Sequence, residues 1–255
     1  MPSSFFEKRR SILRHRPLVV GTLTGRGSLD AQLRRGASPF VDVIELRLDT
    51  FSDVRRPLAR VFAAELLARI RRKTHKPVLL TLRSHTEQPA AARGARRLTD
   101  DEREKLIVPL LTAVQLVDVE ARRRTFAARV TALARRMGVS VIHSYHDFRG
   151  AGRRAELDRL VHAARRQRAD VFKAAVTPRT ERELDDLFRW GLGLEGIGRV
   201  LIGMGPHGAP SRTIGFTFGS LLTYGHLGTS AAPGQWPAAE LGRAVRDIYG
   251  AEERR

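Results

Sequence analysis

The chain has 255 residues, of which 42% are apolar, so it can bury the core of one large domain. It contains no cysteine, no run of about 18 apolar residues and no apolar core near its start, which argues against disulfides, thiolate chemistry, membrane spans and a secretory signal and predicts a cytoplasmic protein. The formal net charge of +19 is typical of nucleic-acid binders, but the basic residues are dispersed over predicted helix faces without an aromatic stripe, so we expect neither a membrane nor a nucleic-acid partner.

Short apolar runs alternate along the chain with segments of helical periodicity, which is typical of parallel α/β folds. The predicted strands span 17–23, 41–48, 77–83, 115–120, 140–145, 170–176, 199–204 and 221–227. Predicted helical segments begin at Glu65, Asp100, Arg153, Glu181 and Pro237, with Asp100 and Thr180 as N-caps. Eight such units predict a single-domain (β/α)8 TIM barrel over residues 17–250, although a doubly wound sheet is also compatible with the count. Residues 1–16 form a basic lead-in and 251–255 a C-terminal tail.

Ionisable residues interrupt several of these strands, mainly toward their C-terminal ends, where barrel enzymes build their active sites. Strands buried on both faces are nearly continuous runs of hydrophobic residues, so these ionisable groups must be paired or functional. They are Glu45, Arg47, Arg83, Glu87, Asp118, Glu120, His143, His146 and Lys173.

Lys173 is one of only five lysines among 46 basic residues, and it lies within the apolar run 171–176. An unpaired charge there would be strongly destabilising. One interpretation is therefore an ion pair with Asp118 or Glu120. The other is an amine made partly neutral by burial and nearby arginines, which would form an imine with a carbonyl substrate.

His143 and His146 occur near the end of the fifth predicted strand, where a histidine can act as general acid and base. Residues three apart lie on opposite faces of an extended strand. We therefore expect at most one of the two to face the site and the other to be a packing or surface residue.

Glu45 and Arg47 are two residues apart and share one strand face, as do Asp118 and Glu120. An internal ion-pair network is one interpretation of these four residues. A cluster of Arg47, Arg83 and Arg212 would also bind an anionic substrate, because arginine binds carboxylates bidentately. The chain has no CxxC, HExxH, P-loop or GxGxxG motif, so we expect no metal and no nucleotide cofactor.

Six motifs in order make the chain resemble the type I 3-dehydroquinate dehydratases over residues 17 to about 245. The motifs are Glu45-Leu46-Arg47-Leu48-Asp49, Thr81-Leu82-Arg83, Ser144-Tyr145-His146-Asp147-Phe148, Lys173, Ser211-Arg212 and Pro233-Gly234-Gln235. The resemblance implies a cofactor-free (β/α)8 lyase of the shikimate pathway, usually a homodimer, that dehydrates 3-dehydroquinate to 3-dehydroshikimate.

Position by position, the resemblance implies that Lys173 forms the imine and that His146 is the general acid/base, with Glu87 as its acidic partner. It implies that His143 takes no part in this chemistry. The substrate-binding groups that it implies are Thr22, Glu45, Arg47, Arg83 and Gln235, with Arg212 as the carboxylate anchor.

The chain departs from the family pattern in two loops. It has Glu87-Gln88-Pro89 where the family usually has E-G-G, and Ala231 where a serine often precedes A-P-G-Q. The hydroxyl missing at Ala231 could be supplied by Ser230 or Thr229. Two alternative functions are a class I aldolase-like Schiff-base enzyme acting on another keto substrate and a degenerate barrel that binds nucleic acid through its basic surface.

Overall fold

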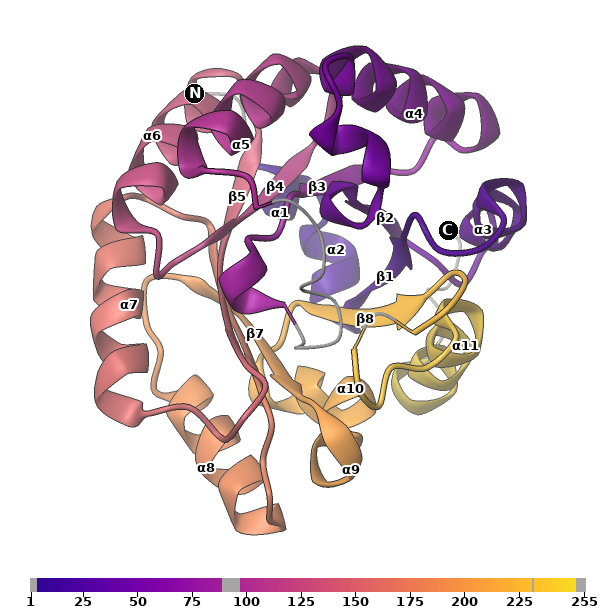
Figure 1. Cartoon of the computed structure of the whole chain (residues 1–255). Coiled ribbons are helices and arrows are strands. Elements are labelled where there is room, and N and C mark those ends of the chain that lie inside the picture. Colours follow the sequence, from indigo (N-terminus) through magenta and orange to yellow (C-terminus); the bar gives the residue numbers. More distant parts are fainter. Residues whose placement is uncertain (1–3, 89–96, 231, 251–255) are drawn as a thin grey trace.

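The computed structural model describes residues 4–88, 97–230 and 232–250, and its centre is a ring of eight parallel strands surrounded by helices (Figure 1). The strands are β1 (Leu18–Leu23), β2 (Val43–Arg47), β3 (Val78–Thr81), β4 (Leu116–Glu120), β5 (Ser140–Asp147), β6 (Val171–Val176), β7 (Gly198–Gly203) and β8 (Leu222–His226). Consecutive strands from β1 to β7 pair with each other and β1 also pairs with β8, giving the order β7-β6-β5-β4-β3-β2-β1-β8. The predicted single-domain (β/α)8 barrel is confirmed, and the doubly wound sheet is excluded by the β1–β8 pairing.

The ring is completed between β7 and β8 by a side chain rather than by a full ladder. One bridge, between Arg199 and Ser220, joins the two edges. The Ser220 hydroxyl accepts a hydrogen bond from the Leu201 backbone N–H at 3.1 Å and donates to the Leu222 carbonyl at 3.2 Å. The barrel is therefore nearly closed, and a serine satisfies backbone groups where the strands separate.

The helices that cover the barrel follow the strands in sequence. They are α3 (Leu29–Gly36), α4 (Ala59–Lys73), α5 (Asp100–Ile107), α6 (Arg124–Arg136), α7 (Arg154–Arg166), α8 (Glu181–Leu192), α9 (Gly205–Gly208), α10 (Ser211–Ile214) and α11 (Ala238–Tyr249). Short 3-10 segments occur at η1 (Leu48–Thr50), η2 (Ser52–Arg55), η3 (His85–Glu87), η5 (Val108–Ala113) and η6 (Gly215–Phe218).

Three sequence expectations about the helices need correction. Helix α4 begins at Ala59 rather than Glu65, because apolar residues continue its buried face toward the N-terminus. The segment from Asp100 is α-helical only to Ile107 and continues as η5, where Pro109 lacks the N–H that an α-helix requires. The N-cap of α5 is Thr99, which forms a capping box with Glu102, whereas the predicted cap Thr180 is confirmed on α8.

The N-terminal lead-in folds against the end of the barrel that is opposite the strand C-termini. It contains α1 (Phe5–Lys8) and α2 (Arg10–Leu13), which lie behind the strands in Figure 1. Phe5 is buried in one cluster with inward-facing strand residues such as Leu18, Leu79 and Leu116. This apolar cluster packs the barrel interior at the N-terminal ends of the strands, where the Phe5 backbone N–H also donates to the Ser140 hydroxyl at 3.0 Å. The C-terminal tail 251–255 lies outside the described residues.

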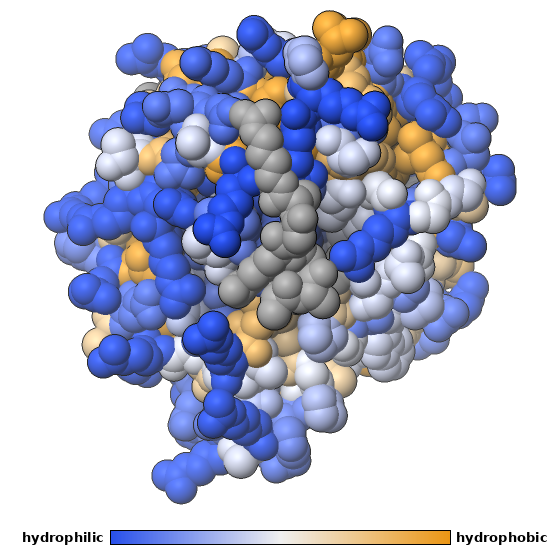
Figure 2. All heavy atoms as spheres, viewed as in Figure 1, coloured by the Kyte–Doolittle hydropathy of each residue, from blue (hydrophilic) through white to orange (hydrophobic). Residues whose placement is uncertain are grey.

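Hydrophilic side chains cover most of the face in Figure 2, with isolated apolar residues between them. Several helices end in basic pairs, for example Arg135 and Arg136 on α6 and Arg165 and Arg166 on α7, where cations interact favourably with the helix dipole. Within the described chain, no helix is both long enough and apolar enough to traverse a bilayer.

Candidate active site

A pocket opens at the C-terminal ends of the strands, and the space in it, part of which is open to solvent, is about 540 Å³. Its lining includes every residue that the sequence singled out for the site: Thr22, Glu45, Arg47, Arg83, Glu87, His146, Lys173, Arg212 and Gln235. Phe148, Ala175, Ile202, Met204, Tyr224 and Ala232 complete it. The pocket therefore combines charged groups of both signs with an apolar wall.

Lys173 projects into this pocket from the middle of β6, where it pairs in register with Ser144 of β5. Its side chain is 5% exposed. The Nζ atom donates a hydrogen bond to Asp118 Oδ2 at 3.1 Å and lies 4.4 Å from the centre of the Tyr224 ring. The ion pair that the sequence left open is thus present, and it coexists with access of the amine to the pocket.

Asp118 on β4 is shared between two cations. Its Oδ1 lies 2.9 Å from Arg83 and accepts a hydrogen bond from the Ser144 hydroxyl at 2.6 Å, while Oδ2 contacts Lys173. Burial alone would raise the pKa of Asp118, but Arg83 and Lys173 outweigh burial and hold its pKa well below the usual range. Asp118 therefore remains a carboxylate and holds the lysine side chain in place.

His146 lies near the end of β5 on the same strand face as Ser144, so it faces the pocket beside Lys173. Its Nδ1 is 3.0 Å from Glu87 Oε2, and its ring stacks on Phe148. Burial, together with the charges of Arg83 and Lys173, lowers the pKa of His146 well below its usual value. The imidazole is neutral at pH 7 and leaves Nε2 for a bound molecule.

Glu87 lies at the end of η3 and is almost completely buried. Burial, reinforced by the neighbouring carboxylate of Glu120, raises the pKa of Glu87 to about 8. The Glu87–His146 pair can therefore hold or release a proton close to neutral pH, which suits a general acid/base unit.

His143 points to the other side of the β5 strand. It is buried, and its Nε2 lies 2.8 Å from the hydroxyl of Thr131 on α6. Burial lowers the pKa of His143 to about 4. The expected separation of the two histidines onto opposite strand faces is confirmed, and His143 is a packing residue between β5 and α6.

Glu45 is held at the pocket floor by hydroxyl groups from both adjacent strands. Thr22 on β1 donates to its Oε2 at 2.8 Å, and Thr81 on β3 donates to its Oε1 at 2.9 Å. The amide of Gln235 donates to the Thr22 hydroxyl at 3.2 Å, which connects the β8–α11 loop to this group. A carboxylate that accepts these hydrogen bonds is oriented to accept further ones from hydroxyls of a bound molecule.

Arg47 and Arg83 both contact Asp49 in the segment after β2. Arg47 makes a bidentate ion pair with it at 3.0 and 2.9 Å, and the Arg83 backbone N–H donates to its Oδ1 at 3.1 Å. The Gln88 side chain donates to Asp49 and to the Arg83 carbonyl, each at 3.1 Å. Gln88, at a position where the resemblance led us to expect glycine, thus fixes the turn that carries Glu87.

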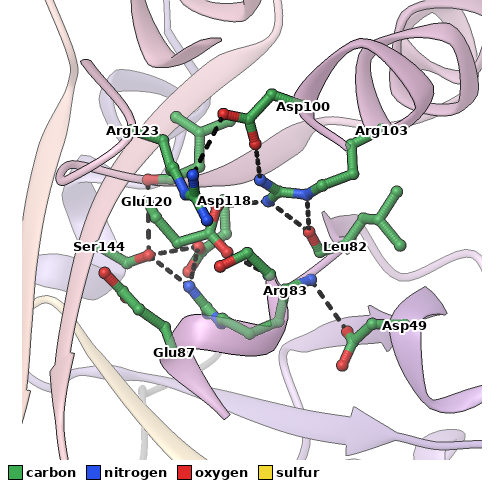
Figure 3. Close-up of polar contacts among 12 residues, drawn as sticks. Asp49, Leu82, Arg83, Glu87, Asp100, Arg103, Asp118, Glu120, Arg123 and Ser144 are labelled. Atoms are coloured by element: carbon green, nitrogen blue, oxygen red, sulfur yellow. Dashed lines mark hydrogen bonds and ion pairs between the residues drawn. The ribbon is translucent and has the colours of Figure 1, made fainter. Parts of the chain in front are cut away.

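Arg103 on α5 is a buried arginine that the sequence reasoning missed. It is 1% exposed and donates twice to the Leu82 carbonyl, once to Asp100 and once to Glu120 (Figure 3). Glu120 also accepts a hydrogen bond from the Ser84 backbone N–H. The guanidinium of this helical residue therefore anchors the start of the turn that leads to Glu87.

Arg212 on α10 is a cation with no carboxylate partner among the described residues. Its guanidinium is buried and donates to the backbone carbonyls of Tyr224 and Pro233 at 3.0 and 3.3 Å. Burial lowers the pKa of Arg212 to about 10, so it keeps its charge at neutral pH. A buried and unpaired cation at the pocket wall suits an anionic group of a ligand.

Two further expectations concern the loop after β8 and metal binding. Ala231 lies outside the described residues, and the adjacent Ser230 donates to the Ala232 carbonyl at 2.7 Å. Over the described ranges, no group of three or more histidine or acidic side chains is arranged to hold a metal ion.

Comparison with known proteins identifies the family whose pattern this site follows. The family model for type I 3-dehydroquinase matches residues 20–252. A 3-dehydroquinate dehydratase from Klebsiella pneumoniae is 35% identical over 223 residues, covering 81% of this chain and 82% of that protein. One from Methanosarcina barkeri is 32% identical over 216 residues, covering 82% and 86%.

Solved structures give the same result. The 3-dehydroquinate dehydratase of Geobacillus kaustophilus superposes with a TM-score of 0.80 at 25% identity and covers 93% of each chain. The type I enzyme of Clostridium difficile, solved with covalently modified comenic acid, superposes with a TM-score of 0.81 at 26% identity, covering 92% of this chain and 93% of that one.

Proposed function

Because the chain belongs to the type I 3-dehydroquinase family, we propose that it dehydrates 3-dehydroquinate to 3-dehydroshikimate through an imine on Lys173. The observation that carries this proposal is a single pocket lined by Lys173, His146 and Arg212. These residues supply an amine for the ketone, a proton acceptor for the adjacent carbon and a cation for the carboxylate. Family membership also favours dehydration over the aldolase-like alternative.

In the first stage, the Lys173 ammonium gives a proton to His146, and the neutral amine attacks the C3 carbonyl carbon. A second Nζ proton moves to the carbonyl oxygen, and His146 returns its proton to this oxygen so that it can leave as water. The carbinolamine expels water and leaves a protonated imine between Nζ and C3. The positive charge on this imine withdraws electrons from C3 and acidifies the proton on C2. Asp118, which already contacts Nζ, provides a negative charge that stabilises the iminium.

In the second stage, the pair reacts in the form in which Glu87 is a carboxylate and His146 carries its proton on Nδ1. Nε2 removes the C2 proton, and the Glu87 carboxylate stabilises the imidazolium that forms. The enamine then expels the C1 hydroxyl, and His146 returns a proton to it so that it leaves as water. Hydrolysis of the product imine releases 3-dehydroshikimate and restores Lys173. His146 takes one proton from C2 and returns one proton to the leaving hydroxyl, so the Glu87–His146 pair ends the cycle in its starting protonation state.

The remaining lining groups are proposed to bind the substrate. Arg212 would pair with its carboxylate, because this buried guanidinium has no acidic partner among the residues that the structure describes. Glu45 and Arg83 would bind its ring hydroxyls together with Thr22 and Gln235, which are already linked to Glu45. Arg47 would add a further positive charge to the pocket lining, beside those of Arg83 and Arg212.

The decisive experiment adds 3-dehydroquinate to the purified protein and follows the absorbance of the conjugated product. We expect turnover in the wild type and none above background in Lys173→Ala. Equal rates for the two proteins would overturn the imine mechanism, and the absence of turnover in the wild type would overturn the proposed activity.

We also propose that the chain works as a homodimer in the cytoplasm, as its family resemblance implies. Light scattering of the purified protein tests the dimer. A monomer at the concentration used for turnover would contradict it.

A further inference from the structure

Tyr224 on β8 lines the pocket and was not singled out by the sequence motifs. It is 4% exposed, and the Lys173 ammonium lies 4.4 Å from the centre of its ring. The same residue's backbone carbonyl accepts a hydrogen bond from Arg212 at 3.0 Å. Tyr224 therefore lies between the amine and the buried cation of the proposed mechanism.

The Tyr224 hydroxyl has no hydrogen-bond partner among the residues described in the structure. Buried hydroxyls in proteins are nearly always paired, because an unpaired one loses its interactions with water without replacement. Burial, with the negative charges of Glu45 and Asp118, raises the pKa of Tyr224 well above its usual value. The hydroxyl therefore keeps its proton at neutral pH and is an unused donor on a residue that lines the pocket.

The neighbouring polar groups do not share this property. Thr22 and Thr81 donate to Glu45, and the Ser144 hydroxyl is bonded to Asp118. These hydroxyls are occupied by the protein, whereas that of Tyr224 is available to a ligand. Its partner should therefore be a molecule that enters the pocket.

We propose that Tyr224 is a further substrate-binding residue, whose hydroxyl donates a hydrogen bond to an oxygen on the substrate ring close to the carbon bonded to Lys173. This inference rests on the proposed function, because that function supplies a hydroxyl-rich ring at this position. The hydroxyl adds a hydrogen-bond donor to the apolar cluster that Tyr224 shares with three other lining residues, Ala175, Ile202 and Met204.

The test is Tyr224→Phe, which removes the hydroxyl and keeps the ring beside Lys173. We expect kcat/KM for 3-dehydroquinate to fall about 10-fold, the usual size of one neutral hydrogen bond to a ligand. The affinity for the product, 3-dehydroshikimate, should fall by a similar factor. The Tm should stay equal or rise, because the unliganded protein loses an unpaired buried group and no hydrogen bond.

Tyr249→Phe is the matched control. The Tyr249 hydroxyl, on α11, donates to the Thr213 carbonyl at 2.9 Å and does not line the pocket. Its removal should lower Tm and leave kcat/KM unchanged. The two tyrosines are therefore expected to give opposite patterns of stability and activity.

Each outcome decides the proposal. Wild-type kcat/KM and product affinity in Tyr224→Phe would overturn it, and so would a lower Tm, which would reveal a protein partner for the hydroxyl. Turnover and borohydride trapping at Lys173 in the wild type report separately on the proposed function. Their absence would overturn both, whereas wild-type turnover with an unaffected Tyr224→Phe would overturn only this inference.

Discussion

The Lys173 ammonium and the Asp118 carboxylate lie 3.1 Å apart inside the barrel, and their side chains are 5% and 0% exposed. Asp118 also pairs with Arg83, so the lysine shares its counter-charge with a second cation. This arrangement makes a buried lysine tolerable while leaving its amine at the pocket surface.

Borohydride reduction in the presence of 3-dehydroquinate is expected to inactivate the protein and leave a mass adduct on the peptide that contains Lys173. Lys76 is the internal control, since burial lowers the pKa of its amine to about 8 and yet it does not line the pocket. Peptide mass spectrometry should find the adduct on Lys173 and not on Lys76. Fully inactivated protein with unmodified Lys173 would contradict the mechanism.

The two histidines of β5 should respond differently to substitution. His146→Ala is expected to lower kcat by a factor of about 10² to 10⁴, the range for loss of a general acid/base, while slower trapping at Lys173 persists. His143→Ala should retain most of its activity and lose stability, because its ring bonds to Thr131 away from the pocket. Steady-state kinetics and thermal unfolding of both variants check this, and an inactive His143→Ala beside an active His146→Ala would refute the assignment.

His143 should also make stability depend on pH. Burial lowers the pKa of His143 to about 4 in the folded protein, against an ordinary value of 6.5, so between these two pH values the unfolded chain binds the proton more readily. The stability contributed by neutral His143 is fully present above pH 6.5 and is lost as the pH falls toward 4. Over this range the free energy of unfolding falls by up to about 3 kcal/mol because of His143. Urea unfolding at several pH values measures the slope.

His143→Gln should flatten that slope, because glutamine does not titrate. His146 is also held neutral by burial and contributes in the same direction, so part of the slope should remain. An identical pH dependence in the variant and the wild type would show that His143 does not contribute.

Arg103→Met is expected to destabilise the protein by about 3–5 kcal/mol, because it leaves the buried Glu120 carboxylate without its cation. It also removes the donors to the Leu82 carbonyl, so the turn bearing Glu87 should loosen and kcat should fall. Denaturant unfolding and the pH profile of kcat test the two effects. Arg129→Met is the control, since its ion pairs with Asp101 and Glu104 are on the surface, and a comparable loss there would contradict the role of burial.

Activity should survive chelator and extensive dialysis. The proposed steps use an imine and a histidine, and the sequence contains no metal-binding or nucleotide-binding motif. Turnover is measured before and after treatment with EDTA. Loss of activity that a divalent ion restores would contradict the cofactor-free mechanism.

Much of the fold could be predicted because its signals are local. Apolar runs marked all eight strands to within about two residues at each end, and the alternation of side chains along β5 placed His143 and His146 on opposite faces. The family resemblance also named nine of the residues that line the pocket, because parallel strands deliver their C-terminal ends to one side of the barrel.

The sequence by itself therefore determined the positions of the strands along the chain, the polar residues within them and the family. Only the tertiary structure decided which groups pair. Lys173 pairs with Asp118 rather than with Glu120, and Glu120 pairs with Arg103, which lies on a helix. The Tyr224 hydroxyl lacks a partner within the described residues. These relationships join residues distant in the chain, and they depend on where closure of the barrel places each side chain, which no local pattern encodes.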